Sequence, residues 1–166
     1  IELLEKNSWE KKYHFTLDLY QEAAAAAQLS ADYVEMEKLA AIVFQNSQTI
    51  LDTVAVYRVK IFALVSQHKL LEAVNTGITA LNKLGFKIKN NPGMVRIAYE
   101  LILAKISLIG KSIEDLIHLP ELQNKQMHAI FEIMSSIGRA AYFASPNLVP
   151  IICFFGLRKS IKLGRS

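Results

Sequence analysis

Cysteine, glycine and blocks of like charge are scarce in this chain, and each scarcity excludes a class of protein. The single cysteine, Cys153, excludes a disulfide framework and a cysteine-based metal site, and its apolar neighbours predict a buried thiol. The seven glycines are isolated, so no phosphate-binding or dinucleotide-binding loop is present. The net charge of +4 comes from scattered lysines and arginines, so we expect no nucleic-acid stripe and no polybasic membrane anchor.

Side chains that could perform chemistry are also dispersed. The four histidines lie far apart, and none has a second histidine or a cysteine at the spacing of metal ligands. The adjacent acids Glu114 and Asp115 would point apart on a helical turn and could not share a substrate. We therefore expect no catalytic residue, no metal and no cofactor, and this part of the chain is predicted not to be an enzyme.

The sequence contains no segment typical of a leader or a membrane span. The most apolar run, residues 140–157, is interrupted by Pro146 and Pro150 and is shorter than the roughly 20 residues of a span. A cytoplasmic protein without membrane contact is expected. The chain begins at Ile1 rather than at a methionine and stops at Ser166, so we expect it to be a segment of a longer protein.

Apolar residues recur at three- and four-residue spacing along the whole chain, which predicts an all-α fold. About seven helices are expected, at about 9–28, 31–46, 49–66, 70–84, 92–110, 123–144 and 146–163. Residues 1–166 would form a single domain. Its parts are a first hairpin (9–48), a second hairpin (49–85), a fifth helix with a short turn (92–119) and the last two helices (123–166).

The two hairpins match each other at an offset of 37 residues, because Tyr20 corresponds to Tyr57 and Met36 to Ala73. A period in the mid-thirties is typical of tetratricopeptide-like units, whose apolar faces are buried only when neighbouring units stack. The expected architecture is therefore a set of antiparallel helix hairpins stacked as an α-α superhelix of the tetratricopeptide type.

Three local patterns add expectations. Thr49 with Asp52 resembles a capping box at the start of the third helix. The fifth helix carries a stripe of Ala98, Ile102, Ile106 and Ile109, expected to pack on a neighbouring helix. The last helix is apolar on every side around Phe154 and Phe155, so we expect this end to be exposed, dimerised or disordered.

Four runs resemble a known family when taken in order. They are FTLDLYQEAAAAAQLSADYVEMEKLA, KLLEAVNTGITALNKLGF, LIGKSIEDLIHLP and AAYFASPNLVP, at residues 15–40, 69–86, 108–120 and 140–150. They are similar to the helical region of very large bacterial, especially cyanobacterial, hybrid sensor kinases. In these proteins the region follows a serine/threonine protein kinase domain and an AAA-type ATPase, and precedes a GAF domain and a histidine kinase. The chain departs from the family at Lys87–Lys89, where acidic and proline-rich sequence is expected.

The resemblance implies a non-catalytic scaffold or sensor segment that contacts other proteins or adjacent domains of its own chain. The parent protein would be an ATP-binding kinase. We expect a partner-binding groove at Tyr20, Tyr57 and Leu64, and a docking end at Phe154 and Phe155 through which copies of the chain could associate. The alternative is a helical-repeat segment of an ATPase-containing transcription regulator.

Overall fold

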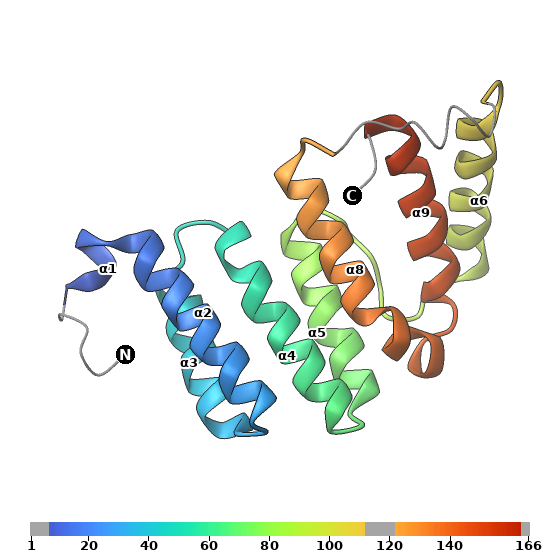
Figure 1. Cartoon of the computed structure of the whole chain (residues 1–166). Helices are drawn as coiled ribbons and strands as arrows, with labels where there is room; N and C mark the ends of the chain where they lie inside the picture. Colours follow the sequence, from blue (N-terminus) through green and yellow to red (C-terminus); the bar gives the residue numbers. More distant parts are fainter. Residues whose placement is uncertain (1–6, 112–121, 164–166) are drawn as a thin grey trace.

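Every regular element of the chain is helical in a computed structural model that describes residues 7–111 and 122–163 (Figure 1). The α-helices are α1 (Ser8–Lys11), α2 (Tyr13–Leu29), α3 (Tyr33–Asn46), α4 (Val54–Ser66), α5 (Leu70–Lys83), α6 (Met94–Leu108), α8 (Lys125–Ala144) and α9 (Leu148–Leu163), and a 3₁₀ helix, η1 (Leu51–Thr53), precedes α4. The predicted all-α class is confirmed. The expected first helix is divided in two, because Lys12 leaves the helical conformation at φ −138° and ψ 51°.

The 37-residue offset is visible in the backbone. Two residues beyond the ends of α2 and α4, Ala31 and His68 both lie in the left-handed region at φ 59°. The same pair of hydrogen bonds closes each end. After α2, the amide of Asp32 donates to the carbonyl of Ala27 and the amide of Ala31 to that of Gln28. After α4, the amide of Lys69 donates to the carbonyl of Leu64 and the amide of His68 to that of Val65. These are Schellman closures, which normally use glycine. Helix α5 ends in the same way, with Gly85 at φ 88°.

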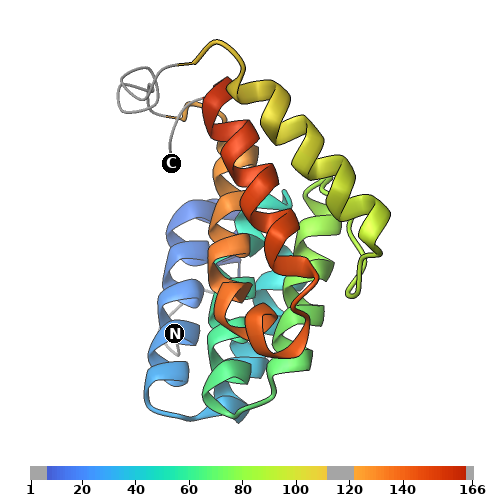
Figure 2. The same ribbon diagram turned by 90° about the vertical axis from the view of Figure 1, so that its right-hand side faces the viewer.

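Five of the helices form a stack, namely α2, α3, α4, α5 and α8. Most helices that are consecutive in the sequence also pack on each other in this stack. Helix α2 packs on α3 and on α4, α4 packs on α5, and α8 packs on both α5 and α4. Helix α8 therefore occupies the place beside the second hairpin that the next helix in sequence, α6, would hold in a regular stack. Helix α6 lies further out and packs on α9 (Figures 1 and 2). A complete superhelix of the tetratricopeptide type stays a prediction.

The displacement of α6 follows from the segment that precedes it. Phe86 and Ile88 are buried in the main core, so residues 86–93 run as an extended strap past α8 instead of turning back onto α5. The ring of Phe86 packs against Phe155 of α9 at 4.2 Å between centroids. Residues Asn90 and Asn91 accept hydrogen bonds from the turn between α8 and α9. The strap thus delivers α6 to the far side of α9.

Asp52 joins the first hairpin to the second. One of its carboxylate oxygens accepts the Tyr13 hydroxyl at 2.7 Å and the amides of Thr49 and Gln48 at 2.8 and 3.1 Å. The reciprocal bond from the Asp52 amide to the Thr49 hydroxyl confirms the predicted capping box. Burial would raise the pKa of the Asp52 carboxyl, but the donated hydrogen bonds outweigh it and hold this pKa below its usual value. Burial, and the bond to Asp52, raise the pKa of Tyr13.

Helices α5 and α8 approach closely at Gly77. A Cβ added there would overlap the Cγ2 methyl of Ile137, which is fully buried on α8. The glycine is therefore required by packing and not by backbone conformation. Gly138, the next residue on α8, has open space around its missing Cβ. None of the helices in the described residues has the length and hydrophobicity needed to cross a membrane.

We expect Gly77→Ala to destabilise the fold. Overpacking a core typically costs about 1–3 kcal/mol, and the intrinsic helical gain of alanine returns about 1 kcal/mol, so a net loss of up to about 2 kcal/mol is expected by urea unfolding. Gly138→Ala is the matched control and should stabilise the protein by about 0.5–1 kcal/mol. Replacing Ile137 by leucine, which lacks the Cγ2 branch, should recover part of the loss. Equal effects at the two glycines would contradict this packing.

We expect Asp52→Asn to cost about 1–2 kcal/mol of unfolding free energy at pH 7, because three donors lose their ionised acceptor. The folded-state pKa of Asp52 is depressed, so its contribution is fully present above about pH 4 and is lost as the pH falls through the folded pKa. The difference between wild type and variant should therefore shrink toward pH 3. Asp18→Asn, at an exposed site on α2, serves as the control. A difference in unfolding free energy that does not change with pH would contradict the role of the ionised Asp52 carboxylate at the junction of the two hairpins.

Candidate functional site

The residues expected to form a partner-binding groove do not share an open surface. Tyr57 is 6% exposed and packs against Phe44 at 4.9 Å between ring centroids. Leu64 is partly buried against the main core, and Tyr20 is partly buried and stacked on Trp9. Burial removes Tyr57 from any surface that a partner could touch, because it lies where α4 meets its neighbouring helices.

The expected docking end on the last helix is also largely covered. Phe155 of α9 is buried against Phe86 of the strap, and Phe154 is partly buried. Helix α9 is covered because α6 packs on one side of it and α8 on another. Cys153, expected to be buried, is instead exposed, since it lies on the side of α9 that neither helix contacts.

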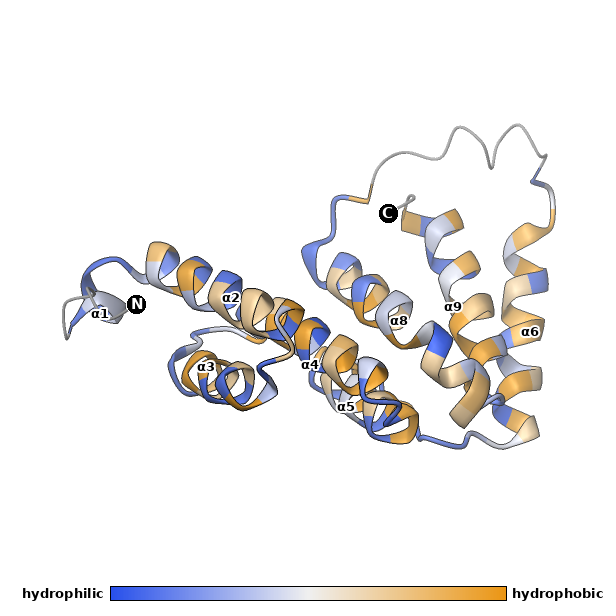
Figure 3. Cartoon of the chain, turned by 60° about the horizontal axis from the view of Figure 1, so that its bottom comes forward, coloured by the Kyte–Doolittle hydropathy of each residue, from blue (hydrophilic) through white to orange (hydrophobic). Residues whose placement is uncertain are grey.

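An exposed apolar surface runs along α6 and ends at Ile109, the residue that follows the helix. Five residues form what we call the apolar row: Val95, Tyr99, Ile102, Ile106 and Ile109, which are 86, 53, 57, 56 and 77% exposed. The expectation that the stripe of the fifth helix packs inward is wrong, because Ala98, Ile102, Ile106 and Ile109 are all exposed. The buried residues of α6 are Glu100 and Ala104, and the helix packs on α9 (Figure 3).

A buried carboxylate explains this orientation. Glu100 is 1% exposed, and its two oxygens accept hydrogen bonds from Arg96, one turn earlier, at 2.9 Å and from Arg158 of α9 at 3.0 Å. A buried carboxylate without partners would be strongly destabilising, so both arginines are needed where they are. The pair with Arg158 fixes the rotation of α6 on α9, and that rotation leaves the apolar row facing solvent.

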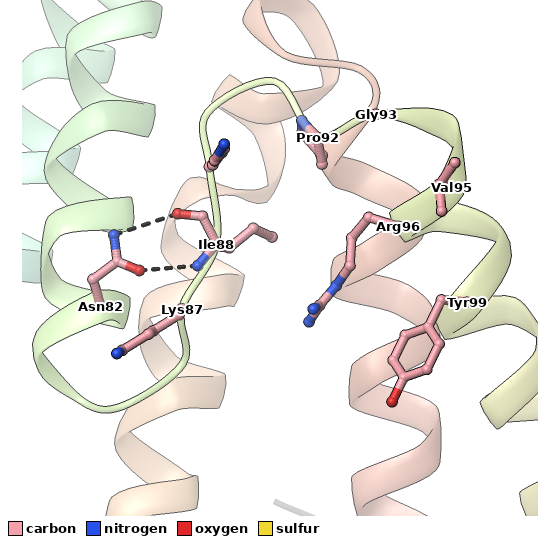
Figure 4. A pocket seen from close by; sticks show the side chains of 9 residues that line it. Asn82, Lys87, Ile88, Pro92, Gly93, Val95, Arg96 and Tyr99 are labelled. Carbon is pink, nitrogen blue, oxygen red and sulfur yellow. Dashed lines mark hydrogen bonds between the residues drawn. The ribbon is translucent and has the colours of Figure 1, made fainter.

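A groove of about 950 Å³ lies between the strap and the first turns of α6 (Figure 4). We call it the basic groove, because Lys87, Lys89 and Arg96 line it together with Asn82, Ile88, Pro92, Gly93, Val95 and Tyr99. The Asn82 side chain holds its strap wall: it accepts from the Ile88 amide at 2.9 Å and donates to the Ile88 carbonyl at 3.3 Å. Arg96 also lies over the ring of Tyr99 at 5.7 Å.

The basic groove and the apolar row are one continuous surface. Val95 and Tyr99 belong to both, and Arg96 lies between them and the buried carboxylate. Its chemistry is cationic and apolar, which suits binding through contact and charge. Sequence reasoning found the stripe on α6 but not its exposure, and it left the basic strap without a role. The sequence does contain a signal for a cationic surface here, because Glu100 is the single acid between residues 86 and 111.

A second hollow, of about 340 Å³, lies between α4 and α8 and holds polar groups already engaged with one another. Arg58 donates to Glu132 at 2.9 Å, and the Ser136 hydroxyl donates to the Glu132 carbonyl at 2.8 Å. His128 also lines the hollow, but no hydrogen bond joins it to Ser135 or Ser136, whereas a serine nucleophile would need one to its base. Within residues 7–111 and 122–163, no group of three or more histidine, cysteine or acidic side chains could hold a metal ion.

We expect Glu100→Gln to loosen α6 from α9. Loss of the charge weakens two charge-assisted hydrogen bonds and leaves Arg158 without an ionised partner, at a cost of about 2–3 kcal/mol. Amide hydrogen exchange along α6 should accelerate more than exchange in α2. Glu132→Gln is the matched control, because its carboxylate is 32% exposed and its pair with Arg58 should contribute less than about 1 kcal/mol. A smaller effect at Glu100 than at Glu132 would contradict the anchoring role.

Known proteins give no independent indication of what this surface binds. Comparison with protein-family models, with curated proteins and with solved structures finds no match for the chain. The similarity to the helical region of hybrid sensor kinases therefore stays a prediction from the sequence. The function has to be inferred from α6, the strap and their charges.

Proposed function

We propose that this chain is a non-catalytic docking scaffold that binds a protein segment or an adjacent domain within a multidomain signalling kinase. The docking function is supported by the apolar row, whose members are between 53 and 86% exposed. The row runs along a helix that a buried ion pair holds in place. The place of the chain within a signalling kinase, and a cytoplasmic setting, are supported by the sequence runs that resemble hybrid sensor kinases.

Exposure of a continuous apolar row has a cost that binding would offset. Single exposed hydrophobic residues are normal on protein surfaces, but contiguous apolar patches mark interaction sites. Burying an isoleucine or valine side chain removes apolar area from water and contributes about 1.5–3 kcal/mol when burial is complete. Four such residues and one tyrosine would supply the centre of an interface, with the lysines at its rim.

The site is also presented rigidly, which favours docking. Glu100 fixes the rotation of α6, and the Asn82 side chain fixes the strap that forms the opposite wall of the groove. A preorganised surface loses less conformational entropy on binding than a mobile one. Helix α6 packs substantially on α9 alone among the described helices, so a partner could cover the row without displacing part of the fold.

A photo-crosslinking amino acid at Ile106 tests this function in the full-length parent protein. We expect crosslinks to a protein or to another domain of the same chain. Crosslinking from Leu71 should be absent, because this residue is similarly exposed, at 53%, but lies on α5. The crosslinked segment, once identified and purified, should bind the wild-type chain, and Ile106→Ser should weaken that binding by about tenfold or more. Equal crosslinking from both positions, or crosslinks to lipid or nucleic acid alone, would refute the proposal.

A further inference from the structure

The partner chemistry can be inferred one step further, on the basis of the docking function just proposed. We propose that the apolar row and the basic groove together bind an amphipathic α-helix whose apolar seam is flanked by acidic residues. The argument uses the spacing of the row, the charge around it and the groove at its end.

The spacing of the row fits a helix. Its members are separated by four, three, four and three residues, which is the alternation of the apolar seam in a coiled coil. At about 100° per residue, the four members within α6 cover roughly 60° of the helix circumference. From Val95 to Ile106 they span about 17 Å, and Ile109 follows the end of the helix, so a partner helix of about 15 residues would cover the row.

The charge around the row is almost entirely positive. The strap (86–93), α6 and α9 contain seven of the nineteen lysines and arginines of the chain but one of its fifteen acids. That acid is Glu100, which is buried and already paired twice. The rest of the chain keeps twelve basic and fourteen acidic residues, so the net positive charge of the protein comes from these three segments.

The flanks of the row carry part of this charge directly. Lys105 is exposed on one side of the row, and Arg96, whose side chain is 43% exposed, lies on the other. Lys87 and Lys89 extend the positive surface beyond the amino-terminal end of α6, across the basic groove. Acidic residues beside the seam of a partner helix would meet Arg96 and Lys105, and acids beyond its end would meet the strap lysines.

Two other occupants fit this surface less well. A second copy of the chain would bring the same lysines toward one another, which raises the electrostatic free energy of association. An anionic membrane would satisfy the lysines, but membrane-surface helices insert a broad apolar face with tryptophan, phenylalanine or leucine. The exposed apolar surface of α6 contains no tryptophan, phenylalanine or leucine, and Tyr99 is its single aromatic residue.

The test uses the full 166-residue chain and two synthetic peptides of about 18 residues. Both carry leucines at alternating four- and three-residue spacing; one has glutamates at the flanking positions and the other has lysines there. Fluorescence anisotropy should show that the glutamate peptide binds about tenfold or more tightly than the lysine peptide at low salt, with the advantage shrinking at high salt. Equal binding of the two peptides at low salt would overturn the inference.

Two sets of variants locate the binding site. Ile102→Ser with Ile106→Ser should weaken binding of the glutamate peptide by about tenfold or more, without lowering the stability of the chain, because both residues are exposed. Leu71→Ser and Phe143→Ser, which remove exposed hydrophobic side chains elsewhere, should leave binding unchanged. Lys89→Glu with Lys105→Glu should abolish the preference for the glutamate peptide, because it leaves two cations and two acids around the row. Loss of binding in the controls, or an unchanged preference, would overturn the inference.

The remaining outcomes separate this inference from the docking function. If phosphatidylserine vesicles bind through the row and neither peptide does, the occupant is a membrane. If the chain forms a dimer in sedimentation that Ile102→Ser with Ile106→Ser abolishes, the occupant is a second copy. If neither peptide binds but Ile106 still crosslinks to an identified protein, the acidic-helix inference fails and the docking function stands. If both peptides and the crosslinking fail, both proposals fall.

Discussion

Arg158 of α9 donates to a carboxylate of α6 that solvent hardly reaches, and the orientation of the outer third of the structure depends on this contact. Helix α6 has two faces that could be buried, one formed by Ala104 with half-buried leucines and one formed by the apolar row. Packing the apolar row against α9 would turn Glu100 toward solvent and leave Arg158 beside apolar side chains. Buried ion pairs contribute little net stability compared with apolar packing. Here the pair selects which face is covered.

The parts of the fold that could be predicted from sequence are those set by local chemistry. Helical periodicity, the offset of 37 residues and the Thr49–Asp52 capping box depend on residues close together in the chain, and the structure contains each of them. The ends of α2 and α4 show the limit of this approach. Ala31 and His68 adopt the left-handed conformation that glycine favours, and only their place in a repeat indicates that they should.

The parts that could not be predicted depend on contacts between distant residues. Periodicity locates an apolar stripe on a helix but does not say whether a neighbour covers it. For α6 the answer lies in Arg158, which is 58 residues beyond its partner Glu100. Tyr57 and Cys153 illustrate the same limit in opposite directions. Tyr57 was expected on a binding surface and is buried by α3 and its neighbours, whereas Cys153 was expected in the core and lies on the uncovered side of α9.

The distribution of charge connects the architecture to its use. In a helical stack, consecutive hairpins bury their apolar faces against one another, and the last helix at each end keeps a face without a partner. A terminal helix that only caps a stack is normally polar on its outer face, because exposed apolar area weakens solubility. Helix α6 is apolar on that face, and the described segments around it, the strap and α9, contribute cations and no acid. A cap would need neither feature, whereas a surface that receives an acidic helix needs both.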